Sequence, residues 1–192
     1  MTTYVEVVGS PFAHDGKLGV PSVPTVTGLT CEDKVTGALH RVTLTFADVA
    51  FSLTDEAGVI AYTGKKVLDM PSGAYAILGA VADFALTKSS AGVNADWDGD
   101  FGVGTVTASN NATLSSTEQN IIPTTATPQA VSGATTADGV MTAALYLDGT
   151  ATASDIYVNF LVDDVDHNVN GTACNLIVNG TLTITYLYMG DN

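Results

Sequence analysis

The chain has 192 residues, of which 46% are apolar and only 14% are charged. This length and composition fit one β domain, or one domain with an arm. With 20 acidic against 6 basic residues, the net charge is −14. That excess argues against nucleic-acid binding, which needs Lys and Arg to replace phosphate counterions, and against binding to anionic membrane surfaces.

Residues 1–28 are expected to precede a single domain that covers residues 29–192. Residues 3–8 alternate between apolar and polar, whereas residues 9–28 contain three prolines, which cannot donate to a sheet ladder. The first 28 residues therefore form either a contact arm or a first strand followed by a loop. The start of the chain shows no basic region followed by an apolar core, so no signal peptide is expected.

Several short strands are expected in the first half of the domain. Period-two alternation predicts strands at residues 39–46, 49–53 and 59–62. Residues 75–86 are apolar almost throughout, which predicts a strand that is buried on both faces or tightly packed. This run contains Asp83 and is too short to cross a bilayer, which takes about 20 residues.

The middle of the chain contains the one helical candidate. Residues 114–123 end in a proline that limits a helix to about two turns, and Ser115 and Glu118 have the spacing of a capping box. Residues 124–139 are rich in Thr, Ala and Pro and predict a surface loop. Residues 140–147 predict a further strand.

The two longest alternating runs lie near the C-terminus. Residues 154–163 place apolar side chains on one face, although Leu161 breaks the pattern on the polar face. Residues 176–188 repeat the alternation, with a Thr-rich second face that is typical of a solvated sheet. We expect these two strands to be the central pair of one antiparallel sheet, joined by a loop over residues 164–175.

The whole pattern predicts eight to ten strands, a turn about every ten residues and at most one short helix. The expected fold is all-β, namely an antiparallel β-sandwich with a jelly-roll-like arrangement.

An acidic loop leads into a strand that contains Gly99, Gly102 and Gly104, and these glycines predict a bulge or a close approach of backbones. The same loop partly matches a calcium-binding loop, with ligand-type residues at the first, third and fifth positions and the turn glycine at the sixth: Asn94, Asp96, Asp98 and Gly99. The twelfth position is Thr105, where a bidentate Glu is required. We therefore expect a solvated acidic loop with no metal requirement, and weak Ca²⁺ binding is the alternative.

A second acidic cluster follows the strand at residues 154–163, and its members are Asp163, Asp164, Asp166 and His167. Such groups can carry out acid–base chemistry or hold a metal ion. Because acidic residues are common in loops, a solvated loop is favoured. The alternative is a hydrolase with a jelly-roll fold that uses Asp163, Asp166 and His167.

Other reactive side chains show no catalytic arrangement. Cys31 and Cys174 lack metal-site spacing, and two thiols are favoured over a disulfide. The three histidines are scattered, and no Gly-x-Ser-x-Gly nucleophile motif is present. Tyr186 and Tyr188 are expected to pack in the core or at a sheet edge in preference to forming a ligand platform. The protein is therefore expected not to be an enzyme and to need no cofactor.

The second half of the chain resembles virion structural proteins of tailed bacteriophages, particularly those that decorate or cement the capsid exterior. The resemblance covers about residues 98–192 and rests on four local patterns: Asp98–Thr105, Thr117–Pro123, Tyr157–Phe160 and Gly180–Tyr186 followed by Gly190 and Asp191. It implies a β-sandwich that binds outside a shell of major capsid protein, often as a homotrimer at three-fold positions.

The resemblance implies a location on the outer capsid surface of the virion, after synthesis in the host cytoplasm. In that setting the arm contacts the capsid, with Tyr4, Val5 and Phe12 as apolar anchors. The alternative is a carbohydrate-binding or adhesin-like β-sandwich, as in a head fibre or a tail component.

Overall fold

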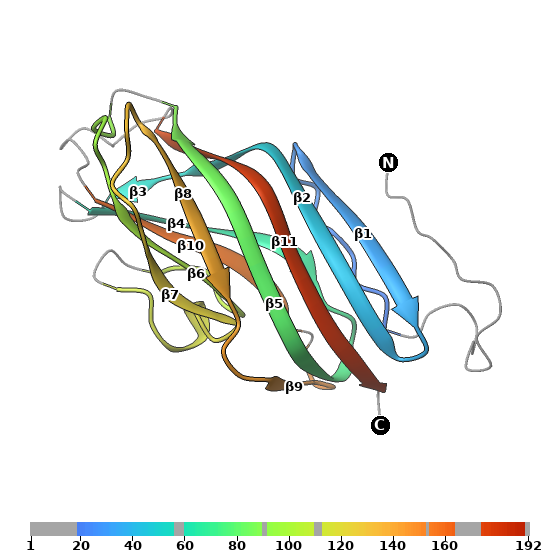
Figure 1. Ribbon diagram of the computed structural model, residues 1–192. Coiled ribbons are helices and arrows are strands. Elements are labelled where there is room, and N and C mark those ends of the chain that lie inside the picture. Colours follow the sequence, from blue (N-terminus) through green and yellow to red (C-terminus); the bar gives the residue numbers. More distant parts are fainter. Residues whose placement is uncertain are drawn as a thin grey trace.

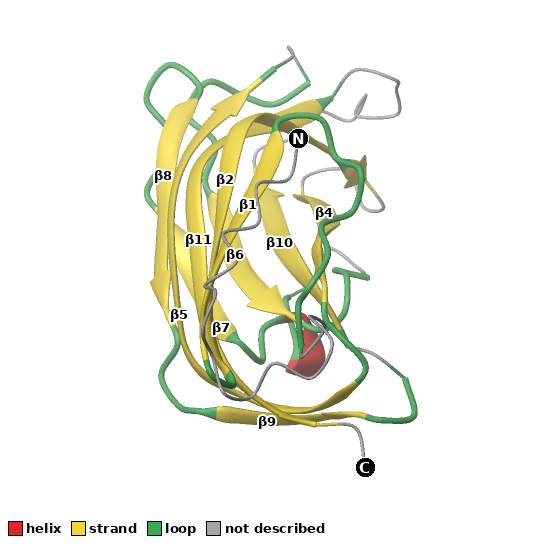
Figure 2. Ribbon diagram, turned by 90° about the vertical axis from the view of Figure 1, so that its right-hand side faces the viewer, coloured by secondary structure: helices red, strands yellow, loops and turns green. Residues whose placement is uncertain are grey.

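The computed structural model describes residues 19–55, 60–89, 92–109, 113–152, 154–163 and 174–190, which form two antiparallel sheets packed face to face (Figures 1 and 2). The elements are, in chain order, β1 (Leu29–Thr36), β2 (Leu39–Ser52), β3 (Thr54–Asp55), β4 (Ile60–Asp69), β5 (Gly73–Lys88), β6 (Gly99–Gly104), η1 (Ser116–Glu118), β7 (Ile122–Thr127), β8 (Ala134–Val140), β9 (Leu145–Gly149), β10 (Asp155–Asp163) and β11 (Asn175–Gly190). Within these ranges, no helix is long and apolar enough to cross a membrane.

The strand order confirms the predicted fold class. The first sheet has the order β1-β2-β11-β5-β8, with β9 also paired to β5, and the second has the order β3-β4-β10-β6-β7. Antiparallel pairs join β2 to β11, β4 to β10, β5 to β8 and β6 to β7. Earlier strands of the chain thus pair with later strands in nested order, and the pairs are distributed over two sheets. The structure is therefore the antiparallel β-sandwich that the sequence predicts.

The inner faces of both sheets meet in a core with several aromatic contacts. Phe84 of the first sheet packs edge-on against Phe46, with ring centroids 5.0 Å apart. Phe51 makes a similar edge-to-face contact with Phe160 of the second sheet at 5.2 Å. Edge-to-face pairs of this kind add to the stabilisation from burial alone. Trp97, in the loop before β6, is also buried in this core.

The two long C-terminal strands exist as predicted, but they do not pair with each other. β10 lies between β4 and β6 in the second sheet, whereas β11 lies between β2 and β5 in the first. The expectation of a central pair was wrong because alternation determines which face of a strand is buried and says nothing about its partner. Each strand is instead central in its own sheet.

The face of β10 that the sequence assigns to solvent is also buried in part. Asn159 and Leu161 lie under the described parts of the connection between β6 and β7, residues 105–109 and 113–121. Leu161 packs there with Leu114, which explains its break in the apolar pattern. The predicted helix over residues 114–123 is reduced to the single 3₁₀ turn η1, drawn red in Figure 2.

The loop predicted over residues 124–139 contains most of β7 and of β8. Its Thr residues are β-branched and suit a strand as well as a loop, so composition misled the prediction. Pro123 is tolerated because β7 is an edge strand of its sheet. The strand predicted at residues 140–147 is also wrong, since β8 ends at Val140 and β9 begins at Leu145. β1 was not predicted at all.

The glycines of β6 occupy the crowded positions that the sequence predicts. The register of β6 against β7 shifts between Phe101 and Val103, which places a bulge at Gly102. A Cβ atom on Gly104 would lie 2.2 Å from the carbonyl oxygen of Thr117. Both the bulge and the close backbone approach are therefore confirmed.

Candidate functional site

The first sheet turns one face to the core and the other, here called the outer face, to solvent (Figure 1). Strand register arranges the side chains of the outer face in rows that cross the strands. One row runs from Thr43 on β2 to Thr183 on β11, whose hydroxyl oxygens lie 3.4 Å apart. The row above it contains Thr45 and Thr181. These rows carry a Thr-rich polar centre, as predicted, and the exposed carboxylates Glu32, Asp83 and Asp138 lie at their sides.

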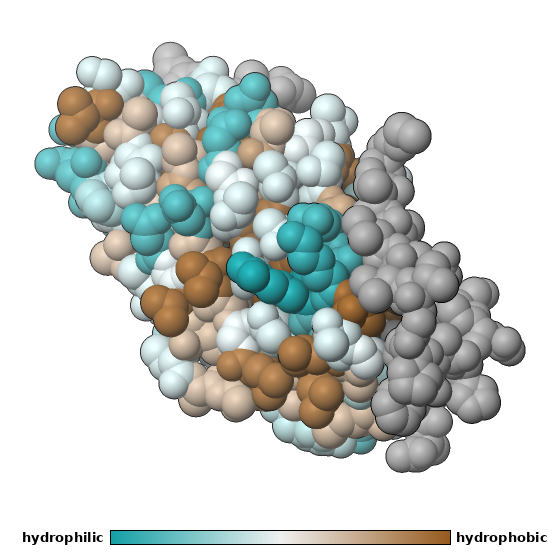
Figure 3. All heavy atoms as spheres, turned by 45° about the vertical axis from the view of Figure 1, so that its right-hand side comes forward, coloured by the Kyte–Doolittle hydropathy of each residue, from teal (hydrophilic) through white to brown (hydrophobic). Residues whose placement is uncertain are grey.

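An apolar patch extends over the outer face from the row of Thr183, Val81 and Val140 towards the C-terminal end of β11. Its members are seven exposed large side chains, namely Leu39, Leu78, Val81, Val140, Tyr146, Leu187 and Met189. Figure 3 shows apolar residues gathered in the lower part of this face. β5 is a strand, as predicted, but it is not buried on both faces. Its exposed face contributes Leu78 and Val81.

The apolar patch is continuous across four strands. Leu39 of β2, Leu187 of β11 and Ala76 of β5 are direct cross-strand neighbours, and Tyr146 of β9 completes the row. Tyr146 is 61% exposed, so its ring lies mostly in solvent. Antiparallel sheets normally present polar residues on the solvated face, and a contiguous exposed apolar patch marks an interaction surface.

The charged side chains of the outer face are segregated. Lys34 of β1 lies directly opposite Arg41 of β2, and both side chains are exposed; Glu32, which is exposed on the same strand, lies 3.4 Å from Lys34. On the other side of β11, Asp83 of β5 lies directly opposite Asp138 of β8. The outer face therefore has a basic side and an acidic side.

Two groups of predicted site residues fall outside the described part of the chain. The arm residues Tyr4, Val5 and Phe12 belong to the first group, and the second is residues 164–167 of the acidic cluster. Asp163, the remaining member of that cluster, ends β10, and its backbone N–H donates a hydrogen bond to the carbonyl oxygen of Asp98 at 2.8 Å.

The calcium-type pattern does not close around a common point. Asn94 and Asp96 are exposed in the loop, but β6 begins at Gly99 and carries the chain away in an extended conformation. Thr105 consequently stands about 20 Å from Asp98, given the rise of a strand. In the described ranges, no three His, Cys, Asp or Glu side chains come together as a metal site would require.

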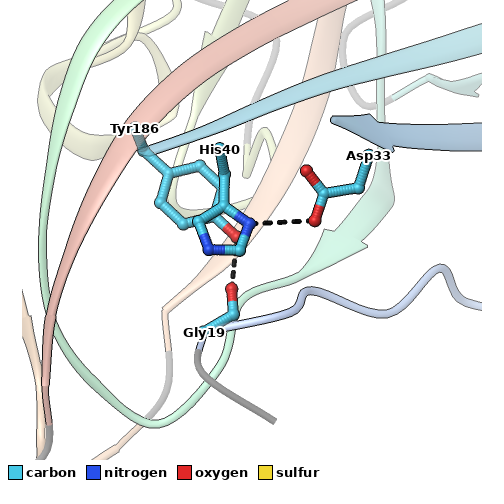
Figure 4. A network of polar contacts seen from close by, with 4 residues as sticks. All are labelled: Gly19, Asp33, His40 and Tyr186. Atoms are coloured by element: carbon cyan, nitrogen blue, oxygen red, sulfur yellow. Dashed lines mark hydrogen bonds and ion pairs between the residues drawn. The ribbon is translucent and has the colours of Figure 1, made fainter. Parts of the chain in front are cut away.

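A buried polar network lies inside the first sheet (Figure 4). His40 Nδ1 donates a hydrogen bond to Asp33 Oδ2 at 2.9 Å, and both side chains are almost completely buried. The His40 ring stacks on Tyr186 with centroids 4.7 Å apart and planes 5° from parallel. The Tyr186 hydroxyl donates to the carbonyl oxygen of Gly19. The network thus ties β1, β2 and β11 to the segment that precedes them.

The chemistry of this region is structural in character. Burial raises the pKa of Tyr186, and the Asp33 carboxylate adds to this effect. Burial, with smaller contributions from Asp33 and Glu32, raises the pKa of the Cys31 thiol to about 11. Cys31 therefore stays protonated at neutral pH, where a thiol is a poor nucleophile. It forms no disulfide with Cys174, as the sequence predicts.

The sequence analysis missed this network, although one signal was present. His40 has the same parity as Val42, Leu44 and Phe46 along β2, so it occupies an inward-facing position. An ionisable side chain at such a position normally needs a buried partner. Tyr186 and Tyr188 are inward-facing too, and the expectation of core packing holds for Tyr186, which is fully buried.

No protein-family model matches the chain. No curated protein matches it either. Among solved structures, it is similar to the enzymatically active domain of tailspike protein 4 of bacteriophage CBA120, with a TM-score of 0.25 and 11% sequence identity. The match covers 89% of this chain and 19% of that chain, so this chain spans about a fifth of the solved structure. A likeness at this level carries no argument about fold or function.

Proposed function

We propose that this protein is a non-enzymatic structural protein of a tailed-phage virion, which decorates or cements the outer surface of the capsid as a homotrimer. The observation that carries the proposal is the outer face of the first sheet. It is a broad surface with Thr-rich polar rows and a contiguous apolar patch, and an exposed apolar patch of this kind marks a surface that packs against another protein. The capsid as partner follows from the family resemblance of residues 98–192.

The composition supports this role. A net charge of −14 disfavours nucleic-acid binding, and only 14% of the residues are charged, which favours a surface of Thr and other neutral residues. A rigid sandwich with such a surface suits repeated docking on an assembled shell. The remaining part of the proposal is that residues 1–28 reach the capsid, with Tyr4, Val5 and Phe12 as anchors.

Electron cryomicroscopy of particles of the phage that encodes this chain tests the proposal. We expect density for a two-sheet sandwich on the outside of the head, absent from particles made without the chain and restored when purified protein is added back. Density only in the tail would contradict the capsid role and would favour the adhesin-like alternative. Particles that never contain the chain would refute the virion assignment altogether.

A further inference from the structure

Two like-charged pairs on the outer face are not explained by the fold of one chain. Lys34 and Arg41 are direct cross-strand neighbours, and so are Asp83 and Asp138. Like charges directly opposite each other destabilise a sheet. Lys34 lies 3.4 Å from Glu32 on its own strand, but no ion pair is found for Arg41, Asp83 or Asp138 with any described residue.

The two pairs lie on opposite sides of the central strand β11. Thr185 of β11 is the neighbour of Arg41, and Thr181 of β11 is the neighbour of both Thr45 and Asp83. The acidic pair therefore stands two rows, or about 13 Å, above the basic pair. The apolar patch extends from the row between them, which contains Val81 and Val140, towards the end of β11.

We propose that the outer face is the surface through which copies of this chain associate. In this arrangement the Lys34–Arg41 side of one copy meets the Asp83–Asp138 side of the next, and the apolar patch is buried between them. A second copy is the occupant that supplies an opposite charge to Arg41 on one side of the face and to Asp83 and Asp138 on the other.

This head-to-tail use of one face is a heterologous contact, which generates a closed ring when the rotation closes. In such a ring, three copies turn their outer faces to a common axis. If the strands are inclined to that axis, the basic side of each copy lies next to the acidic side of its neighbour. The inference rests on the proposed function in its expectation of a homotrimer, and it specifies which face forms the trimer.

The apolar patch alone is too small for a stable interface between two copies, so the Thr-rich rows of the outer face must be buried as well. The patch spans four strands and about seven residues, or about 450 Å². A standard interface buries about 800 Å² on each partner. The Thr43–Thr183 row and the charged pairs must therefore be covered as well, which agrees with a contact that uses the whole face.

Charge reversal with measurement of mass by sedimentation velocity and light scattering tests the inference. We expect the wild type to be a trimer. The variants Lys34→Glu/Arg41→Glu and Asp83→Lys/Asp138→Lys should each dissociate at least about tenfold more readily. The variant with all four changes should recover the trimer, because the charges are again complementary. All four side chains are exposed, so melting temperature should stay close to that of the wild type.

Apolar substitutions give a second, independent measurement. Val81→Glu places a carboxylate in the patch and should yield monomers, whereas Val131→Glu, at a valine that is 78% exposed outside the patch, should remain a trimer. A wild type that is monomeric at every concentration overturns the inference. So does a Val81→Glu variant that assembles like the wild type, or a four-site variant that does not recover assembly.

Binding to capsids separates this inference from the proposed function. A wild type that forms a trimer through the outer face but leaves no density on particles refutes the capsid role alone. A chain that decorates capsids while Val81→Glu still forms trimers refutes the assignment of the outer face alone.

Discussion

Asn159 Nδ2 donates a hydrogen bond to the backbone carbonyl oxygen of Glu118 at 2.7 Å, and this contact joins the outside of β10 to the connection between β6 and β7. The same amide donates to the carbonyl oxygen of Val106 at 2.9 Å, and its Oδ1 accepts from the N–H of Ala108 at 2.8 Å. Glu118 is itself buried and accepts hydrogen bonds from Ser109 and Ser115. One strand residue therefore ties Val106, Ala108 and Glu118 of this connection to β10.

The first prediction concerns this residue. Asn159→Ala removes three hydrogen bonds and leaves buried backbone groups without partners, so we expect the free energy of unfolding to fall by about 2 to 4 kcal/mol. Urea unfolding measures the change. The matched control is Asn179→Ala at a half-buried amide that bonds Asp48, where the loss should stay below about 1 kcal/mol. Equal effects at the two positions would contradict the role of Asn159.

The second prediction concerns the close approach at β6. Gly104→Ala drives a Cβ atom to 2.2 Å from a backbone oxygen, so the strand or η1 must shift, at a cost of about 1 to 3 kcal/mol. Gly79→Ala is the control, because nothing lies within 4 Å of its Cβ position. That change should be neutral or slightly stabilising, since it reduces the entropy of the unfolded chain. Thermal melts of both variants decide the matter, and a harmless Gly104→Ala would show the contact to be looser than described.

The third prediction concerns the buried pair His40 and Asp33. His40→Leu leaves the Asp33 carboxylate buried without its partner, and we expect a loss of about 3 to 5 kcal/mol. Replacing both residues by Leu removes the charged group as well. The free energy of unfolding should then fall by less than the sum of the losses in the two single variants. A double-mutant cycle measured by urea unfolding provides the coupling. Strictly additive effects would mean that the 2.9 Å contact contributes nothing as a pair.

The fourth prediction concerns alkaline pH. The folded Cys31 thiol keeps its proton up to about pH 11, whereas the unfolded chain releases it near the ordinary pKa of 9.0. Between these values the unfolded state binds fewer protons, so the free energy of unfolding falls as pH rises. Because the side chain is partly exposed, the slope should be well below the limit of about 1.4 kcal/mol per pH unit. The difference between wild type and Cys31→Ala, measured under reducing conditions from pH 8 to 10.5, isolates this effect from tyrosine titration, and identical pH profiles would refute it.

The sequence predicted the class of fold because period-two alternation is a local property of each strand. The inward positions of β10 and β11 follow from residues such as Ile156 and Ile184, and both are fully buried. Pairing between strands is not local, and β2 and β11 meet across more than a hundred residues of intervening chain. Alternation alone therefore could not place β10 and β11 in different sheets.

The candidate site was less predictable for the same reason. Leu39, Val81 and Leu187 are ordinary apolar residues of alternating strands, and only the register brings them together on one face. The like-charged pairs are equally invisible in the sequence, since Asp83 and Asp138 become neighbours only through the pairing of β5 with β8. Asn159 lacked a signal of its own, because a polar residue at that parity is what a solvated face would show.

The last prediction concerns the N-terminal arm. The described chain begins at Gly19, whose carbonyl oxygen accepts the Tyr186 hydroxyl bond, and Ser22 is bridged to Asp69 by two backbone hydrogen bonds. These anchors all lie beyond residue 12. We therefore expect a variant without residues 1–12 to keep its sandwich, with a melting temperature within a few degrees of the wild type. Because Tyr4, Val5 and Phe12 are removed, the same variant should no longer sediment with bare capsids. Truncated protein that fails to fold would identify residues 3–8 as a strand of the sandwich, and truncated protein that folds and still binds capsids would place the contact elsewhere on the domain.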